Sequence, residues 1–498
     1  MSSTTSITKP PIESPGKLSK LSIVGYGAGD AANNLAFTTA TMFLLIYYTD
    51  VAGISAAAAG TLLLVVRVFD AFADLFAGRI VDRTYSKRFG KFRPFLMFGS
   101  IPLLLLSVAV FSVPQIGETG VLIYAYLTYA ALGLAYSLVN IPFGSLAGAM
   151  TQDPSERAKL ASARTIGAMI VGAGLGIFVA PLITPENDLQ SIFTFMTLGF
   201  VVVGTALYFF TAFTAKERVK RDVPHVTMKQ SFAILRNNKP LALLCISSFV
   251  FLTGMLALST VQLYYLRDVL NALPLYAVFS IFQLVMVFGL AGFIPKIVRT
   301  FGKRAAYMVG GGIMGVGGII VFLAPPSMVW LGVSGLVISQ LGIVLVNMLV
   351  WALEADTVEY GEWKTGVRAE GIVYALFSFT RKAGQAVGGA LAAYALAWGG
   401  YVANAAAQSE QAMWGIRAGA GLIPLAASIL AISVMFFYPL TDKRHKQIVI
   451  EIAERRELAG QNPNQIDPAL STAAFSAQRP AATAVPPTDP DADPSATN

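Results

Sequence analysis

Long apolar stretches recur along most of the chain, and they set the strongest limit on how it folds. Each stretch is about 20 residues long, the length that an α-helix needs to cross the hydrocarbon core of a bilayer. The chain is 55% hydrophobic and only 13% charged, whereas soluble domains carry about 25% charged residues. We therefore predict an all-α membrane protein with about twelve transmembrane helices. The expected spans are 22–49, 55–81, 95–113, 121–149, 160–183, 191–213, 241–266, 274–295, 305–324, 329–355, 371–399 and 412–438.

Basic residues gather in alternate connections between these spans. The connections after the second, sixth and eighth spans hold many of them, whereas 114–120 and 184–190 hold none. Short positively charged loops stay on the cytoplasmic side of a membrane, so both termini are expected in the cytoplasm. Arg267 is the clearest exception to this pattern. Membrane topology also accounts for the net charge of +8, so we expect the lipid bilayer and no nucleic acid as a partner.

The spans divide into two sets of six. A short pattern follows the second span of each set, as FGKFRPF at 89–95 and as FGKRAAY at 301–307. With the equal span count, this repeat indicates two six-helix halves related by a parallel internal repeat, an arrangement similar to that of major facilitator transporters. The expected organisation is a disordered cytoplasmic tail at 1–20, six-helix bundles at 21–213 and 241–438, a central cytoplasmic loop at 214–240 and a largely disordered cytoplasmic tail at 439–498.

Two carboxylates lie in the middle of the second span. Asp70 and Asp74 are one helical turn apart, so a helix places them on the same face, and Arg67 is close enough in sequence to pair with Asp70. One interpretation is a buried salt-bridge cluster that holds helices together. The other is a cation site, because two close carboxylates cannot both ionise without a counter-charge and so hold a proton or a small cation.

Other polar residues also fall within spans. Arg164 and Lys382 have no acid three or four residues away, so each needs a distant acid or a substrate as its partner. The uncharged candidates are Asn33, Asn34, Ser137 and Asn140. At the end of the tenth span we expect salt bridges between the two halves, formed by Glu354, Asp356 and Glu359.

Soluble-enzyme chemistry has little support in the sequence. The chain has one cysteine and two histidines, and it contains no Walker-type phosphate loop. We therefore expect no catalytic residue, no metal site and no cofactor.

Six segments together resemble the glycoside–pentoside–hexuronide cation symporters. They are YYTDVAG (47–53), RVFDAFAD (67–74), GKFRPF (90–95), NIPFGSL (140–146), EADTVEYGEWKTGVRAEG (354–371) and FSFTRKAGQAVGG (377–389). The likeness covers about residues 20–450. It is nearest to family members that carry glucuronides, and the melibiose carriers are similar too. It implies a major facilitator fold, alternating access and a multi-pass protein of the bacterial inner membrane.

The resemblance also implies roles for individual residues. Asp70 and Asp74 match the family's cation-site carboxylates, and Ser137 matches a cation-binding hydroxyl. Ala73 replaces an asparagine that helps melibiose carriers to bind sodium, and Gly144 replaces a tryptophan at their sugar site. The expected substrate-binding residues are Asn33, Asn34, Arg67, Asn140, Arg164 and Lys382.

We therefore expect a secondary active symporter that imports glucuronides. Asn34 and Asn140 stand where the melibiose carriers have aspartates, and the loss of two negative charges suits an anionic hexuronide. Arg164 or Lys382 would then hold the carboxylate of the substrate. A neutral glycoside or pentoside is the alternative substrate within the family. A membrane sensor or scaffold that transports nothing is the alternative outside it.

The coupling ion is expected to be H⁺. Ala73 offers no side-chain oxygen to sodium, which needs several oxygen ligands, whereas a proton needs one carboxylate. Arg67 favours the ionised form of Asp70, so the transported proton is expected on Asp74. Coupling to Na⁺ is the alternative.

Overall fold

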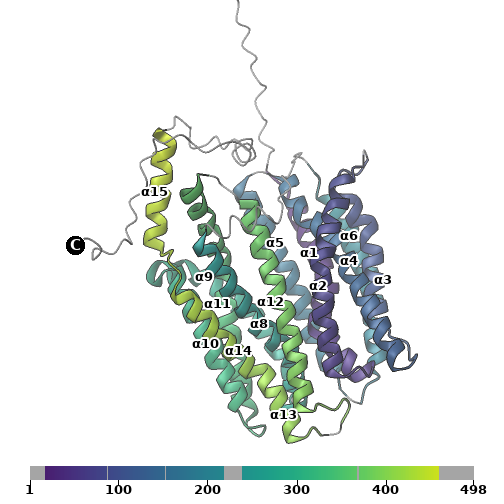
Figure 1. Ribbon diagram of the computed structural model, residues 1–498. Helices are drawn as coiled ribbons and strands as arrows, with labels where there is room; N and C mark the ends of the chain where they lie inside the picture. Colours follow the sequence, from purple (N-terminus) through teal and green to yellow (C-terminus); the bar gives the residue numbers. More distant parts are fainter. Residues whose placement is uncertain are drawn as a thin grey trace, which may run out of the picture.

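The computed structural model describes residues 17–86, 88–151, 153–184, 186–217, 238–366, 370–405 and 407–458. Within these ranges the chain is helical, and its only extended pairing is a single bridge between Ser86 and Gly90 (Figure 1). Every expected span coincides with a helix or with consecutive helical segments, which confirms the predicted all-α class.

Six spans form the first half of the molecule. They are α1 (Lys20–Ile46, continued by the π-helical turn Tyr47–Val51), α2 (Ala56–Arg83), α3 (Ser100–Val110, preceded by Phe95–Gly99), α4 (Glu118–Met150), α5 (Pro154–Gly174, continued by Leu175–Val179 and Ala180–Leu182) and α6 (Leu189–Thr214).

Six further spans and one additional helix form the second half. They are α8 (Lys239–Tyr264, continued by Tyr265–Val269), α9 (Leu275–Phe301), α10 (Lys303–Leu323), α11 (Val329–Thr365), α12 (Glu370–Gly399), the last span made of α13 (Glu410–Arg417), Ala418–Leu422 and α14 (Ile423–Phe436), and the additional helix α15 (Asp442–Leu458).

Local capping explains several of these boundaries. The side chains of Ser19, Ser55 and Asn238 each accept a hydrogen bond from a backbone N–H in the first turn of α1, α2 and α8. Gly366 ends α11 in the left-handed conformation with φ 74°, which glycine adopts without strain.

Most of the expected spans are also apolar enough to cross a membrane. In the described residues nine helices are long and apolar enough to cross a membrane, or ten if the two segments of α9 form one span. These segments meet at an angle of 57°, and Pro295 in the helix explains the bend because it removes a backbone donor. Only α1 and α12 of the twelve expected spans fall short of this test. They carry Asp30 and Lys382, and charged residues of this kind lower the mean hydropathy of a span.

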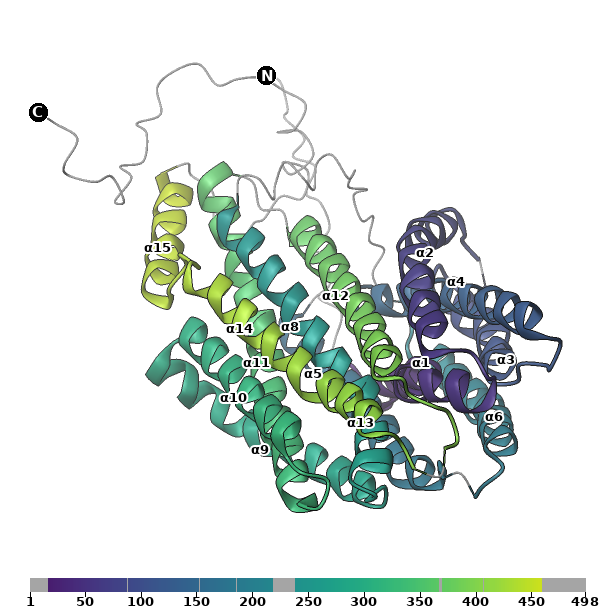
Figure 2. The same cartoon turned by 60° about the horizontal axis from the view of Figure 1, so that its bottom comes forward.

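The two ends of the bundle differ in what they carry. One end, at the top of Figure 1, holds α15 and the connections after α2 and α9; we call it the α15 end. The other end holds the connections after α1, α8 and α12, and we call it the far end. Helices α2 to α4 lie on one side of the molecule and α10, α11 and α14 on the other (Figure 2).

The halves meet most closely toward the far end. There α2 packs against α12, and the turn after α5 packs against α9. A Cβ atom at Gly60 would lie only 2.8 Å from the Cβ of Ala393, and one at Gly176 only 2.0 Å from the Oγ of Ser280. Glycine at these two positions therefore lets the helices of the two halves approach each other.

Helix α15 falls within 439–498, where we expected a largely disordered tail. It packs against α11, and the Trp363 indole donates a hydrogen bond to Glu451 at 2.6 Å. These contacts explain why the first part of the segment is ordered. The predictions for 459–498, for 1–16 and for 218–237 of the central loop lie outside the described residues.

Candidate functional site

Asp74 on α2 connects the two halves. Its Oδ1 accepts a hydrogen bond of 2.6 Å from the Ser137 hydroxyl on α4, and its Oδ2 forms an ion pair with the ammonium of Lys382 on α12. Both oxygens therefore have a partner, one from each half. The sequence predicted that Asp74 and Ser137 lie together, whereas the contact with Lys382 depends on how the halves pack.

Asp70, one turn away, is in a different environment. Its Oδ2 lies 3.5 Å from Nη1 of Arg67, as the spacing on the helix predicts. Its Oδ1 is buried and has no hydrogen-bond partner in the described residues. This oxygen fills the space beside Gly133 of α4, where an added Cβ would lie 1.9 Å from it. An unpartnered buried carboxylate oxygen is unfavourable when ionised.

Arg164 has a carboxylate partner on α1. Its Nε donates to Oδ1 of Asp30 at 2.8 Å, and its guanidinium lies over the ring of Phe143, 5.1 Å from the centroid. Asn34 donates to the other Asp30 oxygen at 3.1 Å and accepts from Thr38 at 2.8 Å. Arg164 and Asn34 thus belong to one network, with Asp30 at its centre.

The two remaining asparagines are placed differently from each other. Asn140 on α4 is half-buried and makes no hydrogen bond with other described residues, so its amide is free to meet a ligand. Asn33 is 1% exposed and accepts a hydrogen bond of 2.7 Å from Tyr208 on α6. The substrate role predicted for Asn33 does not fit this placement, because its side chain points into the first half.

A small cavity of about 30 Å³ lies between the halves. Arg67 and Tyr129 line it from the first half, and Thr260 and Gln385 line it from the second. Arg67 also lies over the ring of Phe37 at 5.4 Å from the centroid. The cavity shows that Arg67 faces the interface between the halves, where a substrate-binding residue is expected.

Salt bridges between the halves at Glu354, Asp356 and Glu359 were predicted, and the structure shows another arrangement. Asp356 pairs with Lys303 of α10 at 2.7 Å, and His445 of α15 lies 3.5 Å from Asp356 and also pairs with Glu359. Glu354 is 8% exposed and forms no ion pair with other described residues. The pairs lie within the second half, because α10, α11 and α15 pack together on one side of the bundle.

A family model described as MFS/sugar transport protein matches residues 25–442. The chain belongs to this family. It is a membrane transporter of the major facilitator fold and not an enzyme. The match spans both six-helix halves, so it includes every site residue described above except His445.

Curated relatives of this transporter cover nearly its whole helical part. A glucuronide carrier protein homolog of Escherichia coli (strain K12) is 46% identical over 89% of this chain and 98% of its own length. A putative sulfoquinovose importer of Salmonella typhimurium is 34% identical over 89% and 95%. An isoprimeverose transporter of Lactiplantibacillus pentosus is 32% identical over 86% and 90%.

Solved structures of other transporters share the fold. The nucleoside transporter NupG has a TM-score of 0.58 at 12% identity, over 84% of this chain and all of that one. A bacterial homologue of the iron transporter ferroportin has a TM-score of 0.61 at 15% identity, over 84% and 97%.

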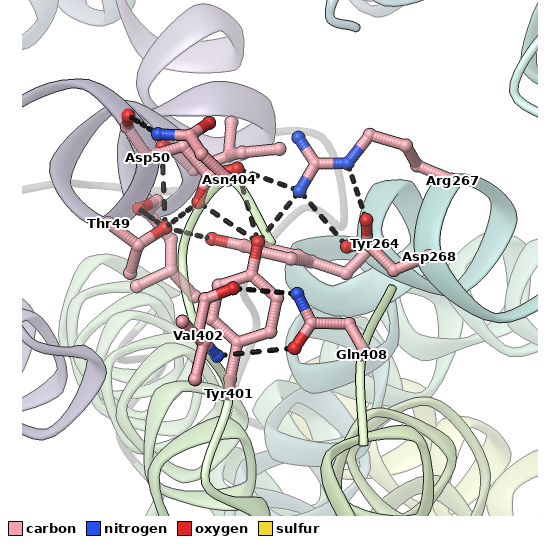
Figure 3. Close-up of polar contacts among 11 residues, drawn as sticks. Thr49, Asp50, Tyr264, Arg267, Asp268, Tyr401, Val402, Asn404 and Gln408 are labelled. Carbon is pink, nitrogen blue, oxygen red and sulfur yellow. Dashed lines mark hydrogen bonds and ion pairs between the residues drawn. The ribbon is translucent and has the colours of Figure 1, made fainter. Parts of the chain in front are cut away.

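This transporter also has a cluster of polar residues at the far end that the sequence did not predict as functional (Figure 3). Asp50, at the end of the first span, accepts a hydrogen bond of 2.7 Å from Arg267 and bonds of 3.0 and 3.1 Å from the Tyr401 hydroxyl. Asn404 donates to the backbone oxygen of Asp50 at 2.6 Å. We call these four residues the Asp50 cluster.

The Asp50 cluster joins the two halves. Asp50 belongs to the first half, whereas Arg267, Tyr401 and Asn404 belong to the second. Thr49 and Tyr264 add a hydroxyl contact of 2.9 Å beside it. The sequence contained one signal of this cluster, since Arg267 was the basic residue that broke the charge pattern of the loops.

Proposed function

We propose that this protein is a proton-coupled symporter that imports glucuronides by alternating access. The observation that carries the proposal is Asp74, which bonds Ser137 of the first half and Lys382 of the second at the same time. A change of charge on Asp70, one helical turn away on α2, alters the electrostatic environment of this contact between the halves. Binding of a cation can therefore bias the equilibrium between two arrangements of the halves.

Asp70 is the better place for the proton in this conformation. The sequence favoured Asp74 because Arg67 pairs with Asp70, but Lys382 supplies Asp74 with a counter-charge from the other half. Asp70 keeps a buried oxygen without a partner. We propose that the proton binds Asp70 while Lys382 holds Asp74 ionised.

Two features of the site favour H⁺ over Na⁺. The Lys382 ammonium already occupies one oxygen of Asp74, and a positive charge there repels a metal cation. Ala73, between the two carboxylates, is 3% exposed and offers no side-chain oxygen, whereas sodium needs several. A proton needs only the free oxygen of Asp70.

The substrates named for two relatives support an anionic substrate. One is named for glucuronide, and another for sulfoquinovose, whose sulfonate is also an anion. A neutral glycoside is the second candidate, because one relative is named for isoprimeverose and Arg164 is already neutralised by Asp30.

We also propose that the α15 end faces the cytoplasm of a bacterium, across its inner membrane. That end carries basic residues of the loops, among them Arg88, Lys91 and Lys303. The bonds of the Asp50 cluster hold the halves together at the far end. The conformation is then one that is shut toward the outside.

The test uses the full-length protein in sealed liposomes. Uptake of phenyl β-glucuronide is measured under an imposed pH gradient, and separately under an imposed Na⁺ gradient at fixed pH. We expect accumulation that follows the pH gradient. Accumulation that follows sodium and ignores the pH gradient would contradict the proton assignment, and the absence of any glucuronide movement would contradict the substrate.

A further inference from the structure

The cations predicted to bind substrate already have acids. Arg164 pairs with Asp30 at 2.8 Å, and Lys382 pairs with Asp74. Arg67 lies 3.5 Å from Asp70. A substrate carboxylate could bind one of them only by competing with a carboxylate that the protein holds close by.

Arg381 on α12 differs from these three. Its guanidinium lies over the rings of Trp351 and Phe377, 5.1 and 5.9 Å from their centroids. With other described residues it makes one hydrogen bond, a long contact of 3.5 Å from Nη2 to the Asn347 side-chain oxygen. Among the residues that the structure describes, no carboxylate pairs with it. Glu354, further along α11, does not pair with it either. A guanidinium at this depth without a counter-charge is unfavourable.

Arg381 lies near the cavity between the halves. Gln385 lines the cavity that Arg67 lines from the first half, and Arg381 lies one turn before Gln385 on the same face of α12. Lys382, the next residue of α12, reaches Asp74 of the first half. Arg381 is thus close to the interface between the halves.

We propose that Arg381 binds the carboxylate of the sugar acid and so makes this transporter selective for hexuronides over neutral hexosides. The inference rests on the function proposed above. The planar guanidinium offers two parallel N–H donors to a carboxylate, and the rings of Trp351 and Phe377 fix its plane. Asn347 donates its own amide to the backbone oxygen of Ile343 at 3.1 Å, which directs its side-chain oxygen toward Arg381.

The proposal gives the two halves separate roles in recognition. Asn140 has a free amide for sugar hydroxyls in the first half, and Arg381 holds the acid from the second. A substrate that contacts both halves stabilises the conformation in which they close around it. A neutral hexoside lacks the second contact.

The experiment compares three probes that differ only at one carbon. Full-length wild-type and Arg381→Gln proteins in liposomes are assayed by counterflow with phenyl β-glucuronide, its methyl ester and phenyl β-glucoside. We expect wild type to prefer the acid to the ester. Arg381→Gln should reduce that preference on the order of 10- to 100-fold, since a charge-assisted hydrogen bond is lost, while transport of the ester and the glucoside stays within about twofold.

Arg417→Gln is the matched control. Arg417 is also buried, lies over an aromatic ring, Trp414, at 4.3 Å, and has no acid partner in the described part of the chain, but it belongs to the last span near the far end. Its replacement should leave the ratio of acid to ester unchanged. An equal fall of the ratio in both variants would overturn the assignment, because any lost buried charge would then have the same effect.

Arg381→Lys keeps the proposal testable if Arg381→Gln does not insert into membranes. Lysine retains the charge without the two parallel donors, so we expect an intermediate ratio. Suppose that wild type carries glucuronide and that both variants keep the wild-type ratio of acid to ester transport. That result would overturn the role of Arg381. If only Arg381→Lys inserts, a wild-type ratio in that variant would overturn it as well. Failure of wild type to move glucuronide would instead overturn the proposed function, and this inference with it.

Discussion

Asp50 and Arg267 lie 2.7 Å apart and join the two halves of the protein at the far end. The Asp50 side chain has no exposed surface, and that of Arg267 is 8% exposed. Arg267 also pairs with Asp268 at 2.8 Å, so two carboxylates fix the position of its guanidinium. Removing one partner of such a desolvated ion pair strongly destabilises the structure that holds it, because the other charge is left buried and uncompensated.

Removal of this pair should open the far end. We expect Asp50→Asn to increase labelling of a cysteine at Thr260, which lines the cavity, by several-fold with a membrane-impermeant maleimide. The single native cysteine, Cys245, is first replaced by alanine. Asp188→Asn is the control, because Asp188 caps α6 through hydrogen bonds with Ser191 within its own half. Unchanged labelling in Asp50→Asn would show that the Asp50 cluster does not hold this end shut.

The two carboxylates of α2 should both be needed for uphill transport. We expect Asp70→Asn and Asp74→Asn each to abolish accumulation of phenyl β-glucuronide against its gradient, because an amide cannot carry the proton or balance Lys382. Exchange down the gradient should survive better in Asp70→Asn, since Asp74→Asn also leaves Lys382 without its acid. Full accumulation by either variant would exclude that residue from coupling.

Arg164 was predicted to discriminate between charged and neutral substrates, and its partner Asp30 changes that expectation. We now expect Arg164→Gln to reduce counterflow of phenyl β-glucuronide and of phenyl β-glucoside by the same factor, because it leaves Asp30 unpaired. The double variant with Asp30→Asn should recover part of the loss, since no charge then remains without a partner. A selective loss of glucuronide transport would restore Arg164 as the carboxylate-binding residue.

His445 should make the packing of α15 depend on pH. The hydrogen bond to Glu359 raises the pKa of His445 above its usual 6.5, so the folded state favours the charged imidazole. This contribution is fully present below about pH 6.5, and it is lost as the pH rises through the raised value.

The measurement is the Tm of the solubilised protein. We expect His445→Gln to lower the Tm at pH 6 by on the order of 1–3 °C and to have a smaller effect at pH 9. Lys446→Gln is the control, as Lys446 is a neighbouring base on the same helix. An equal effect of His445→Gln at both pH values would argue against a charged imidazole in the folded state.

Several features of the protein follow from the sequence alone. Hydropathy located the spans, because the length of an apolar run is a local property and a bilayer demands about 20 residues of it. The charges within spans were visible for the same reason, so Asp70, Asp74, Arg164 and Lys382 could be singled out without a structure. The pairing of Arg67 with Asp70 was also predictable, since one helix places both groups.

The partners of most of these charges were decided only by the tertiary structure. Lys382 meets Asp74 across 308 positions in the chain, Arg164 meets Asp30 across 134, and Arg267 meets Asp50 across 217. Which face of one helix meets which face of another depends on the packing of whole spans, and no local pattern encodes it. For the same reason, the tertiary structure decided that Asn33 points into the first half and that Glu359 pairs within the second. It also left Arg381, next to Lys382 in sequence, without an acid partner among the described residues.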